Sequence, residues 1–316
     1  MEKEAILVIG ANGQIGTALY PKLQEVYGAE NVVASDLRSS FEGNGQFEQL
    51  DATDFQSLSK IVSKYKVTQI YHLAAVLSAK AEADPIWAWN LNIQTLLNIL
   101  EAGKQFKLKK LFIPSSIAVF GENAPAENTP QITYLDPSTV YGISKVATEN
   151  WMHYYYSRFN VDVRSLRYPG VISYQSMPGG GTTDYAVDMY HKATSNEKYT
   201  CFLSPDTRLP MIYIDDVLRA TLELMEAPAE KIKVRSSYNL AGLSFTPAEL
   251  YESLKSYYPD FSCEYAPDFR QDIAASWPKT IDDSSARQDW GWEPEFNLEK
   301  MTRDMVKHLS AIPSLK

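Results

Sequence analysis

The sequence predicts an α/β protein: a Rossmann-type, doubly wound parallel sheet joined to a smaller, discontinuous α/β substrate lobe. Short β-branched runs alternate with longer amphipathic runs through the first half of the chain, as expected when strands alternate with helices. The first run, Ile6-Leu7-Val8-Ile9, is apolar throughout, which is typical of a strand buried on both faces. After Pro169 the runs become short and mixed, which indicates the second lobe.

The first half contains the elements that would build the sheet. Short runs rich in β-branched and apolar side chains predict strands at 5–9, 32–35, 47–50, 69–73, 110–114 and 161–167. Longer amphipathic runs predict helices at 14–27, 55–65, 86–106 and 141–159. This order of elements is typical of a parallel sheet with helices on both faces.

The second half has weaker signals. We expect loops at 173–182 and 204–210, strands at 213–214 and 238–240, and helices near 217–225 and after Asn297. A helix after Ser244 is well defined, because Thr246 suits the N-cap, Pro247 the first helical position and Glu249 the third.

These elements suggest a division into two parts. The dinucleotide-binding domain takes 1–172, with returns near 213–240 and 297–316. The smaller lobe takes 173–212 plus 241–296.

Composition narrows the class of protein. The 316 residues are 45% apolar and 22% charged, as in ordinary globular proteins. A net charge of −9 argues against nucleic acid or an anionic membrane as the main partner. The four histidines and the cysteines Cys201 and Cys263 show no metal-ligand spacing, so no metal is expected. Without a long apolar stretch, and with a strand predicted at the very start, we expect a cytoplasmic protein with no signal peptide.

A glycine-rich turn follows the first strand and opens the first helix. Its G-x-x-G-x-x-G spacing permits a tight turn and a close approach of the backbone to a pyrophosphate at the helix N-terminus. Asp36 ends the second strand, where it suits a hydrogen bond to a ribose 2′-hydroxyl and favours NAD over NADP. Arg38 could accept a 2′-phosphate instead, or could be a solvated loop residue. The turn residues assigned to the cofactor are Gly10, Asn12, Gly13, Gln14, Ile15 and Gly16.

Further cofactor contacts are expected where the later strands end, because parallel strands present their carboxyl ends at one edge of a sheet. Asp51 follows the third strand, where it either meets the adenine amino group or helps to cap the next helix. The small residues Ala74 and Ala75 would let the cofactor pass close to the backbone. Tyr168 and Pro169 would bound the nicotinamide. We also assign Ala52, Leu73 and Asn90 to this site.

Three polar residues predict the chemistry. Tyr141 and Lys145 are about one helical turn apart and share a face. An ammonium near a phenol favours the phenolate, so Lys145 is expected to lower the pKa of Tyr141 and make it a base. Ser116 ends the fifth strand, where its hydroxyl can hydrogen-bond a substrate oxygen. The Tyr–Lys spacing alone is weak evidence, and it gains weight from the glycine-rich turn and the serine that precede it.

With these motifs in place, the chain resembles the extended short-chain dehydrogenase/reductase family, which includes nucleotide-sugar epimerases and dehydratases. The resemblance rests on the glycine-rich turn, Asp36, His72-Leu73-Ala74-Ala75, the string Ser116-Ile117-Ala118-Val119-Phe120-Gly121, the Tyr141/Lys145 pair and Ile214-Asp215-Asp216-Val217. It implies an NAD cofactor, catalysis by the matching Ser, Tyr and Lys, and a homodimer formed through the helices near 86–106 and 141–159.

The second half resembles one branch of this family more closely, the short-chain L-threonine 3-dehydrogenases. The matching strings lie at 167–173, 178–185, 209–211, 223–229 and 276–278. This resemblance implies a small amino-acid substrate, and we favour Thr183 slightly over Thr182 as a contact. Without it, the triple glycine at 179–181 would be a flexible loop and Trp277 a core residue. The substrate-site residues it suggests are Ser78, Ser116, Tyr141, Gly181, Thr182, Thr183 and Trp277.

The resemblance therefore implies NAD-dependent oxidation of L-threonine at its β-hydroxyl to 2-amino-3-oxobutyrate, a step of threonine catabolism toward glycine or aminoacetone. Tyr141 would remove the hydroxyl proton, Ser116 would orient the hydroxyl, and Lys145 would bind the ribose and hold the phenolate. Two alternatives stay open: a nucleotide-sugar epimerase or dehydratase of the same fold, and a non-catalytic NAD-sensing protein. Residues 173–212 lack evident basic and aromatic features for a nucleotide diphosphate, and the intact catalytic set argues against the sensor.

Overall fold

The structure of the protein, a computed structural model, describes residues 4–175, 177, 179 and 181–311. Its main sheet has six parallel strands in the order β3-β2-β1-β4-β5-β7. The chain winds outward from β1 in both directions, which confirms the predicted doubly wound fold. These strands are β1 Ile6–Ile9, β2 Val32–Asp36, β3 Gln46–Gln49, β4 Gln69–His72, β5 Lys110–Phe112 and β7 Val163–Arg164.

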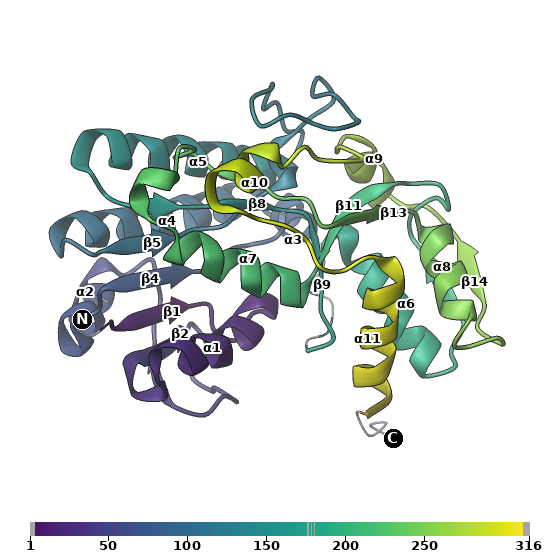
Figure 1. Ribbon diagram of the computed structural model, residues 1–316, viewed down its shortest axis with the longest axis horizontal. Helices are drawn as coiled ribbons and strands as arrows, with labels where there is room; N and C mark the ends of the chain where they lie inside the picture. The colour runs from purple at the N-terminus through teal and green to yellow at the C-terminus, as the bar shows by residue number, and fades with distance from the viewer. Residues whose placement is uncertain (1–3, 176, 178, 180, 312–316) are drawn as a thin grey trace.

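Helices cover both faces of this sheet (Figure 1). Successive side chains of a strand point to opposite faces, so each strand contributes to two cores. Ile6 and Val8 of β1 share a core with α1 and α7, whereas Leu7 and Ile9 share one with α2, α4 and α5. The predicted bounds of the first two long helices are confirmed. The five helices are α1 Gln14–Tyr27, α2 Phe55–Tyr65, α4 Pro85–Gln105, α5 Val140–Phe159 and α7 Ile214–Glu226.

Three smaller sheets extend the fold beyond the main sheet. The strand expected at 161–167 is split, because β7 pairs with β5 whereas β8 pairs with β6 and β12. The predicted end of the loop at 204–210 is wrong, because Leu209 and Pro210 already belong to β11. The sheets are β6 Ser115–Ser116, β8 Leu166–Tyr168 and β12 Tyr238–Asn239; β9 Gly170–Ile172, β11 Leu209–Tyr213 and β13 Leu243–Phe245; and β10 Tyr199–Cys201 with β14 Cys263–Tyr265.

The second lobe packs three helices together: α6 Tyr185–Thr194, α8 Pro247–Lys255 and α11 Leu298–Ala311 (Figure 1). The predicted capping box of α8 is confirmed. The Glu249 N–H donates to Thr246 Oγ1 at 3.2 Å, and the Thr246 N–H donates to Glu249 Oε2 at 2.9 Å.

The position of α11 corrects the expected domain division. Its Thr302 hydroxyl lies 2.8 Å from the Tyr190 hydroxyl of α6 and accepts a 2.8 Å bond from Ser253 Oγ of α8. Met301, Met305 and Leu309 form its buried stripe. Residues 298–311 therefore pack on the second lobe rather than returning to the main domain as expected, whereas α7 packs against α1. The rest of the expected division stays a prediction.

The remaining elements are short. They are α3 Ser78–Ala83, α9 Arg270–Ala275, α10 Ser284–Trp290, and the 3-10 turns η1 Ala29–Asn31, η2 Ile117–Val119, η3 Thr182–Asp184 and η4 Ala229–Lys231. Across the described ranges, no helix has the length and apolar character that a membrane span requires.

Candidate active site

The turn between β1 and α1 has room only for glycine at two positions. Gly10 has a φ of +86°, and a Cβ there would lie 2.7 Å from the Ala74 nitrogen. A Cβ on Gly16 would collide with the Gly10 carbonyl oxygen. The helix α1 begins without a side-chain cap from Gly13 and without an acidic residue in its first turn. Its first N–H groups therefore suit an anion, so the turn fits the pyrophosphate of a dinucleotide.

Asp36 ends β2 beside this turn and is fixed by two backbone N–H groups. Asn12 N donates to Asp36 Oδ2 at 3.0 Å, and Arg38 N donates to Oδ1 at 3.1 Å. Arg38 folds back over the loop: its Nη2 donates to the Asn12 carbonyl at 2.6 Å, and its Nε lies 3.4 Å from Asp36 Oδ1. The Arg38 guanidinium thus stabilises the loop, and its charge is paired with Asp36. This arrangement favours Asp36 as the residue that binds the ribose and Arg38 as a residue that supports the loop.

A cavity of ≈ 430 Å³ runs along the strand ends beside Asp36. Asp51 faces it and accepts from Thr53 N at 2.9 Å and from Thr53 Oγ1 at 2.7 Å. The helix α2 is capped by Asp54, so the capping alternative for Asp51 falls away. Lys80 and Trp87, which the sequence did not single out, also line this cavity. The expected cofactor residues gathered here are Gly10, Gly13, Asp36, Arg38, Asp51, Ala52, Leu73, Ala74 and Ala75.

Asn90 does not line this cavity, so its assignment to the cofactor site stays a prediction. It is exposed on α4. Asn92 is buried instead: its Oδ1 accepts from Val76 N at 2.9 Å, and its Nδ2 lies 3.4 Å from Ser144 Oγ. Two residues along an α-helix rotate a side chain by about 200°, so the two asparagines point to opposite faces.

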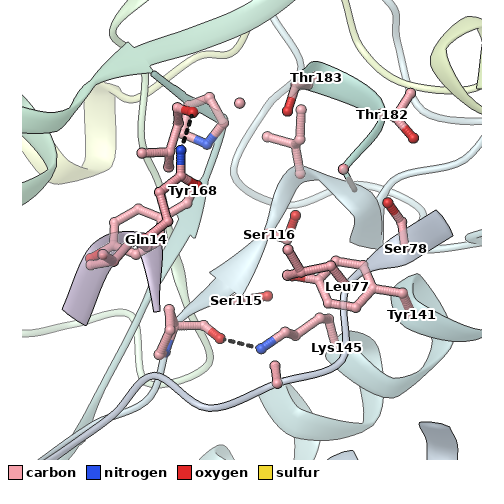
Figure 2. A pocket seen from close by; sticks show the side chains of 18 of the residues that line it. Gln14, Leu77, Ser78, Ser115, Ser116, Tyr141, Lys145, Tyr168, Thr182 and Thr183 are labelled. Carbon is pink, nitrogen blue, oxygen red and sulfur yellow. Dashed lines mark hydrogen bonds between the residues drawn. The ribbon is translucent and has the colours of Figure 1, made fainter. Parts of the chain in front are cut away.

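A second cavity, of ≈ 140 Å³, lies where β6, β8 and α5 meet η3 (Figure 2). Figure 2 shows Thr182 and Thr183 across the cavity from Ser116 and Lys145. Pro178 and Gly180 of the matching string lie outside the described residues. The cavity brings together every predicted catalytic and substrate residue. Its lining includes Gln14, Ile15, Ser78, Ser116, Tyr141, Lys145, Tyr168, Pro169, Gly181, Thr182, Thr183 and Trp277.

The electrostatics of Tyr141 and Lys145 differ from the sequence expectation. Burial raises the pKa of Tyr141 to about 12, with Ser116 acting in the opposite direction. Burial also lowers the pKa of Lys145 to about 8, against the charge of Glu149, which raises it. The Lys145 ammonium donates to the Pro114 carbonyl at 2.7 Å and lies 5.7 Å from the centre of the Tyr141 ring. The lowered Tyr141 pKa expected from the spacing is therefore wrong for the chain alone, because burial raises it and the group that acts against burial is Ser116 rather than Lys145.

Ser116 and Tyr168 occupy adjacent strands at the base of the cavity, as partners in the β6–β8 register. Ser116 accepts a 3.2 Å bond from Ala118 N, which fixes its side chain at the start of η2. The Tyr168 hydroxyl bonds Thr221 in the core, so its ring rather than its hydroxyl bounds the cavity.

The opposite wall is built by the turn at η3. Asp184 accepts from Gly181 N at 2.7 Å and closes this turn. Thr182 is buried, and its hydroxyl oxygen has no hydrogen-bond partner among the described residues. A Cβ on Gly170 would come within 2.7 Å of Thr183, so only glycine lets β9 approach this wall. The unpartnered hydroxyl makes Thr182 the stronger candidate for a polar ligand contact, although the sequence favoured Thr183.

Sequence reasoning missed Leu77, Val171 and Asp184 as lining residues of this cavity. Asp184 was visible as a carboxylate after the two threonines. Val171 lay in the matching string 167–173 without being assigned to the site, and Leu77 is apolar and carried no signal. Among the residues that the structure describes, no three His, Cys, Asp or Glu side chains gather as a metal site.

Comparisons with known proteins agree with this geometry. The model of the NAD dependent epimerase/dehydratase family matches residues 6–241. An uncharacterized epimerase/dehydratase from Staphylococcus aureus is 46% identical, over 98% of both chains.

Solved structures of high similarity carry a more specific description. A partial consensus L-threonine 3-dehydrogenase has a TM-score of 0.96 at 54% identity, covering 97% of this chain and 99% of that one. The holo form of an L-threonine dehydrogenase from Cupriavidus necator has a TM-score of 0.96 at 52% identity, covering 96% and 99%. A monomeric L-threonine 3-dehydrogenase from a metagenome has a TM-score of 0.94 at 48% identity, covering 96% and 98%.

Proposed function

Since the chain belongs to the NAD dependent epimerase/dehydratase family and is an NAD-dependent oxidoreductase of the short-chain type, we propose that its substrate is L-threonine. The reaction converts L-threonine and NAD⁺ to 2-amino-3-oxobutyrate, NADH and a proton, as a step of threonine catabolism. The observation that carries this proposal is the ≈ 140 Å³ cavity, which joins the acid–base residues to the unpartnered Thr182 hydroxyl.

The size of the cavity favours a small substrate. Pockets that enclose drug-sized ligands measure roughly 300–1,000 Å³. A cavity of ≈ 140 Å³ suits an amino acid better than a nucleoside diphosphate sugar. Ser78, Thr182 and Thr183 offer hydroxyls around it, and the Gly181–Asp184 turn offers backbone groups for a substrate carboxylate and ammonium.

In the proposed mechanism Tyr141 Oη takes the proton of the β-hydroxyl. Ser116 hydrogen-bonds the same oxygen and stabilises the negative charge that develops on it. Lys145 would hold the ribose hydroxyls and contributes positive charge beside Tyr141. NAD⁺, when bound, supplies the acceptor for the hydride that leaves Cβ. The turn at η3 and the ring of Trp277 exclude water from the reacting carbon.

A tyrosine with a pKa of about 12 needs help to act as a base. Forming its phenolate at pH 7 costs about 7 kcal/mol, since each pKa unit corresponds to roughly 1.4 kcal/mol. Positive charge near the phenolate offsets part of this cost. The Lys145 ammonium would supply this charge if it turned from the Pro114 carbonyl toward Tyr141. We therefore propose that Lys145 exchanges partners when the cofactor binds.

The alternative of a nucleotide-sugar epimerase is tested by ligand stabilisation. With NAD⁺ present, L-threonine should raise the melting temperature and UDP- or TDP-sugars should not. A stabilising sugar nucleotide, with no effect of threonine, would contradict the proposal.

We also propose a homodimer formed through α4 and α5. Their outer faces carry apolar side chains that are partly open to solvent: Ile86 (72% exposed), Ile143 (47%), Trp151 (38%), Tyr154 (47%) and Phe159 (36%). A second copy of the chain would cover them, because an apolar face of this kind is typical of an association surface. A cytoplasmic location stays a prediction.

A further inference from the structure

A buried carboxylate joins three elements directly behind the catalytic cavity. Glu149 of α5 has a side-chain exposure of 2%. Its Oε1 accepts from Ser115 Oγ at 2.7 Å and from Arg167 Nε at 2.8 Å, and its Oε2 accepts from Arg167 Nη2 at 2.7 Å. One side chain thus connects α5 to β6 and to β8.

The two strand residues that Glu149 binds are partners in the parallel β6–β8 register. Ser115 pairs with Arg167, and the next pair is Ser116 with Tyr168. Successive strand residues point to opposite sides. Glu149 therefore holds the register pair that precedes Ser116 and Tyr168, and Ser115 itself also lines the cavity, so a shift at Ser115 would move Ser116 with it.

Glu149 also lies on the catalytic face of its own helix. It is one turn beyond Lys145, which is itself one turn beyond Tyr141. The helix is thus fixed to the β6 segment at two levels: Lys145 binds the Pro114 carbonyl, and Glu149 binds Ser115. Because we propose that Lys145 leaves the Pro114 carbonyl when the cofactor binds, the Glu149–Ser115 contact is the one that still sets how far the Tyr141 face stands from Ser116 in the reacting complex.

Arg167 is anchored on its far side, which makes the junction rigid. Its Nη1 donates to Asn239 Oδ1 at 2.9 Å and to the Gln131 carbonyl at 3.1 Å. The Asn239 amide donates in turn to the Thr129 and Asp282 carbonyls, at 3.1 and 3.0 Å. The guanidinium has few alternative partners, so its pair with Glu149 defines one geometry.

We propose that Glu149 is a positioning residue for the reaction: it holds Ser116 and the Tyr141/Lys145 face in register, and it presents a fixed negative charge to Lys145. The inference rests on the proposed function only in taking these three residues as the reacting set. It does not depend on the identity of the substrate.

The groups around Lys145 explain why the negative charge of Glu149 matters. The groups that face Lys145 are Glu149 from the same helix, Tyr141 one turn earlier and His72 from β4. Burial and the charge of Lys145 hold the pKa of His72 at about 3, so His72 is neutral during catalysis. Tyr141 is neutral in the resting chain. Glu149 is therefore the negative group that helps Lys145 keep its proton against desolvation.

Two variants test the proposal. Glu149→Gln removes the charge and keeps the shape, but it leaves Arg167 without a counter-charge and risks unfolding. The double variant Glu149→Leu/Arg167→Met replaces the pair with apolar side chains, and such replacements are often neutral or stabilising. A matched control is Arg235→Met, which breaks another buried ion pair, the 2.6 Å contact with Asp162, outside the cavity lining.

The decisive readout is the pH dependence of kcat for threonine oxidation. Removing the negative charge lowers the pKa of Lys145, so less ammonium is present at a given pH and the Tyr141 phenolate is disfavoured. We expect the alkaline limb of the kcat profile, where Lys145 loses its proton, to move downward by about one pH unit, and kcat at pH 8 to fall about fivefold or more with little change in KM for NAD⁺. Arg235→Met should lower the melting temperature and leave the profile in place. A folded double variant with the wild-type profile and kcat would overturn the proposal.

A substrate-independent measurement separates this inference from the proposed function. The Lys145 Cε signal can be followed by NMR in ¹³C-lysine-labelled protein with NAD⁺ bound and assigned by its loss in Lys145→Met. Its apparent pKa should be lower in the double variant than in the wild type and unchanged in Arg235→Met. If threonine is not oxidised but this shift occurs, the substrate assignment fails and the role of Glu149 stands. An unshifted signal would overturn that role.

Discussion

Replacing Tyr141 with Phe isolates the proposed base. The change removes one oxygen and leaves the ring, which packs against the main core. Ser116 keeps its bond from Ala118 N, so the loss in stability should be within about 1 kcal/mol. A general base contributes roughly 10²–10⁴-fold to a rate. We therefore expect kcat to fall by that factor while NAD⁺ affinity stays close to that of the wild type.

The pH profile adds a second signature of the same residue. Because burial raises the pKa of Tyr141 to about 12, its basic form is scarce at neutral pH and grows as pH rises. Wild-type kcat/KM should therefore climb steeply through the neutral range, by up to about tenfold per pH unit. In Tyr141→Phe the residual rate should lose this slope.

The assay is stopped-flow detection of NADH, with threonine saturating for kcat and below KM for kcat/KM, and NAD⁺ affinity is measured separately by fluorescence. A folded Tyr141→Phe enzyme that turns over within roughly fivefold of the wild type would rule out Tyr141 as the base, since that loss is far below a base contribution. An unchanged pH slope in the variant would assign the titration to another group.

Other residues give further tests. Asp36→Ala removes the ribose partner and releases the paired Arg38 guanidinium; NADP⁺ should then compete about 10-fold better or more, and an unchanged NAD⁺/NADP⁺ ratio of kcat/KM would exclude Asp36 from this role. Thr182→Val and Thr183→Ala should each raise KM for threonine more than KM for NAD⁺. The larger effect should come from Thr182, whose hydroxyl lacks a protein partner, and unaltered threonine KM in both would remove this wall from the substrate site. Trp151→Glu should shift sedimentation toward the monomer if α4 and α5 form the dimer, whereas Thr200→Glu, at the one exposed position of β10, should not.

Local signals predicted part of the fold well. The helices α1 and α2 have the expected bounds because the glycine-rich turn and the Asp54 cap define their starts. The site residues converge because parallel strands end at one edge of the sheet, which spacing along the chain already implies.

Tertiary effects set the rest. No local pattern shows that 161–167 divides between two sheets, or that α11 docks on α6 and α8. The pKa of Tyr141 depends on burial, which the Tyr–Lys spacing does not encode. Glu149 and Arg167 are eighteen residues apart in the sequence. They form an ion pair because the fold brings α5 next to β8. Asn90 and Asn92 both lie on α4 and differ only in the face of the helix that carries them. Which face packs inward depends on tertiary contacts.

We propose above that this site oxidises L-threonine with NAD⁺. The most direct measurement mixes the purified protein with NAD⁺ and L-threonine and follows NADH absorbance, with Tyr141→Phe as the control. We expect NADH formation that requires both threonine and Tyr141. Absence of NADH from a folded protein that binds NAD⁺ would contradict it.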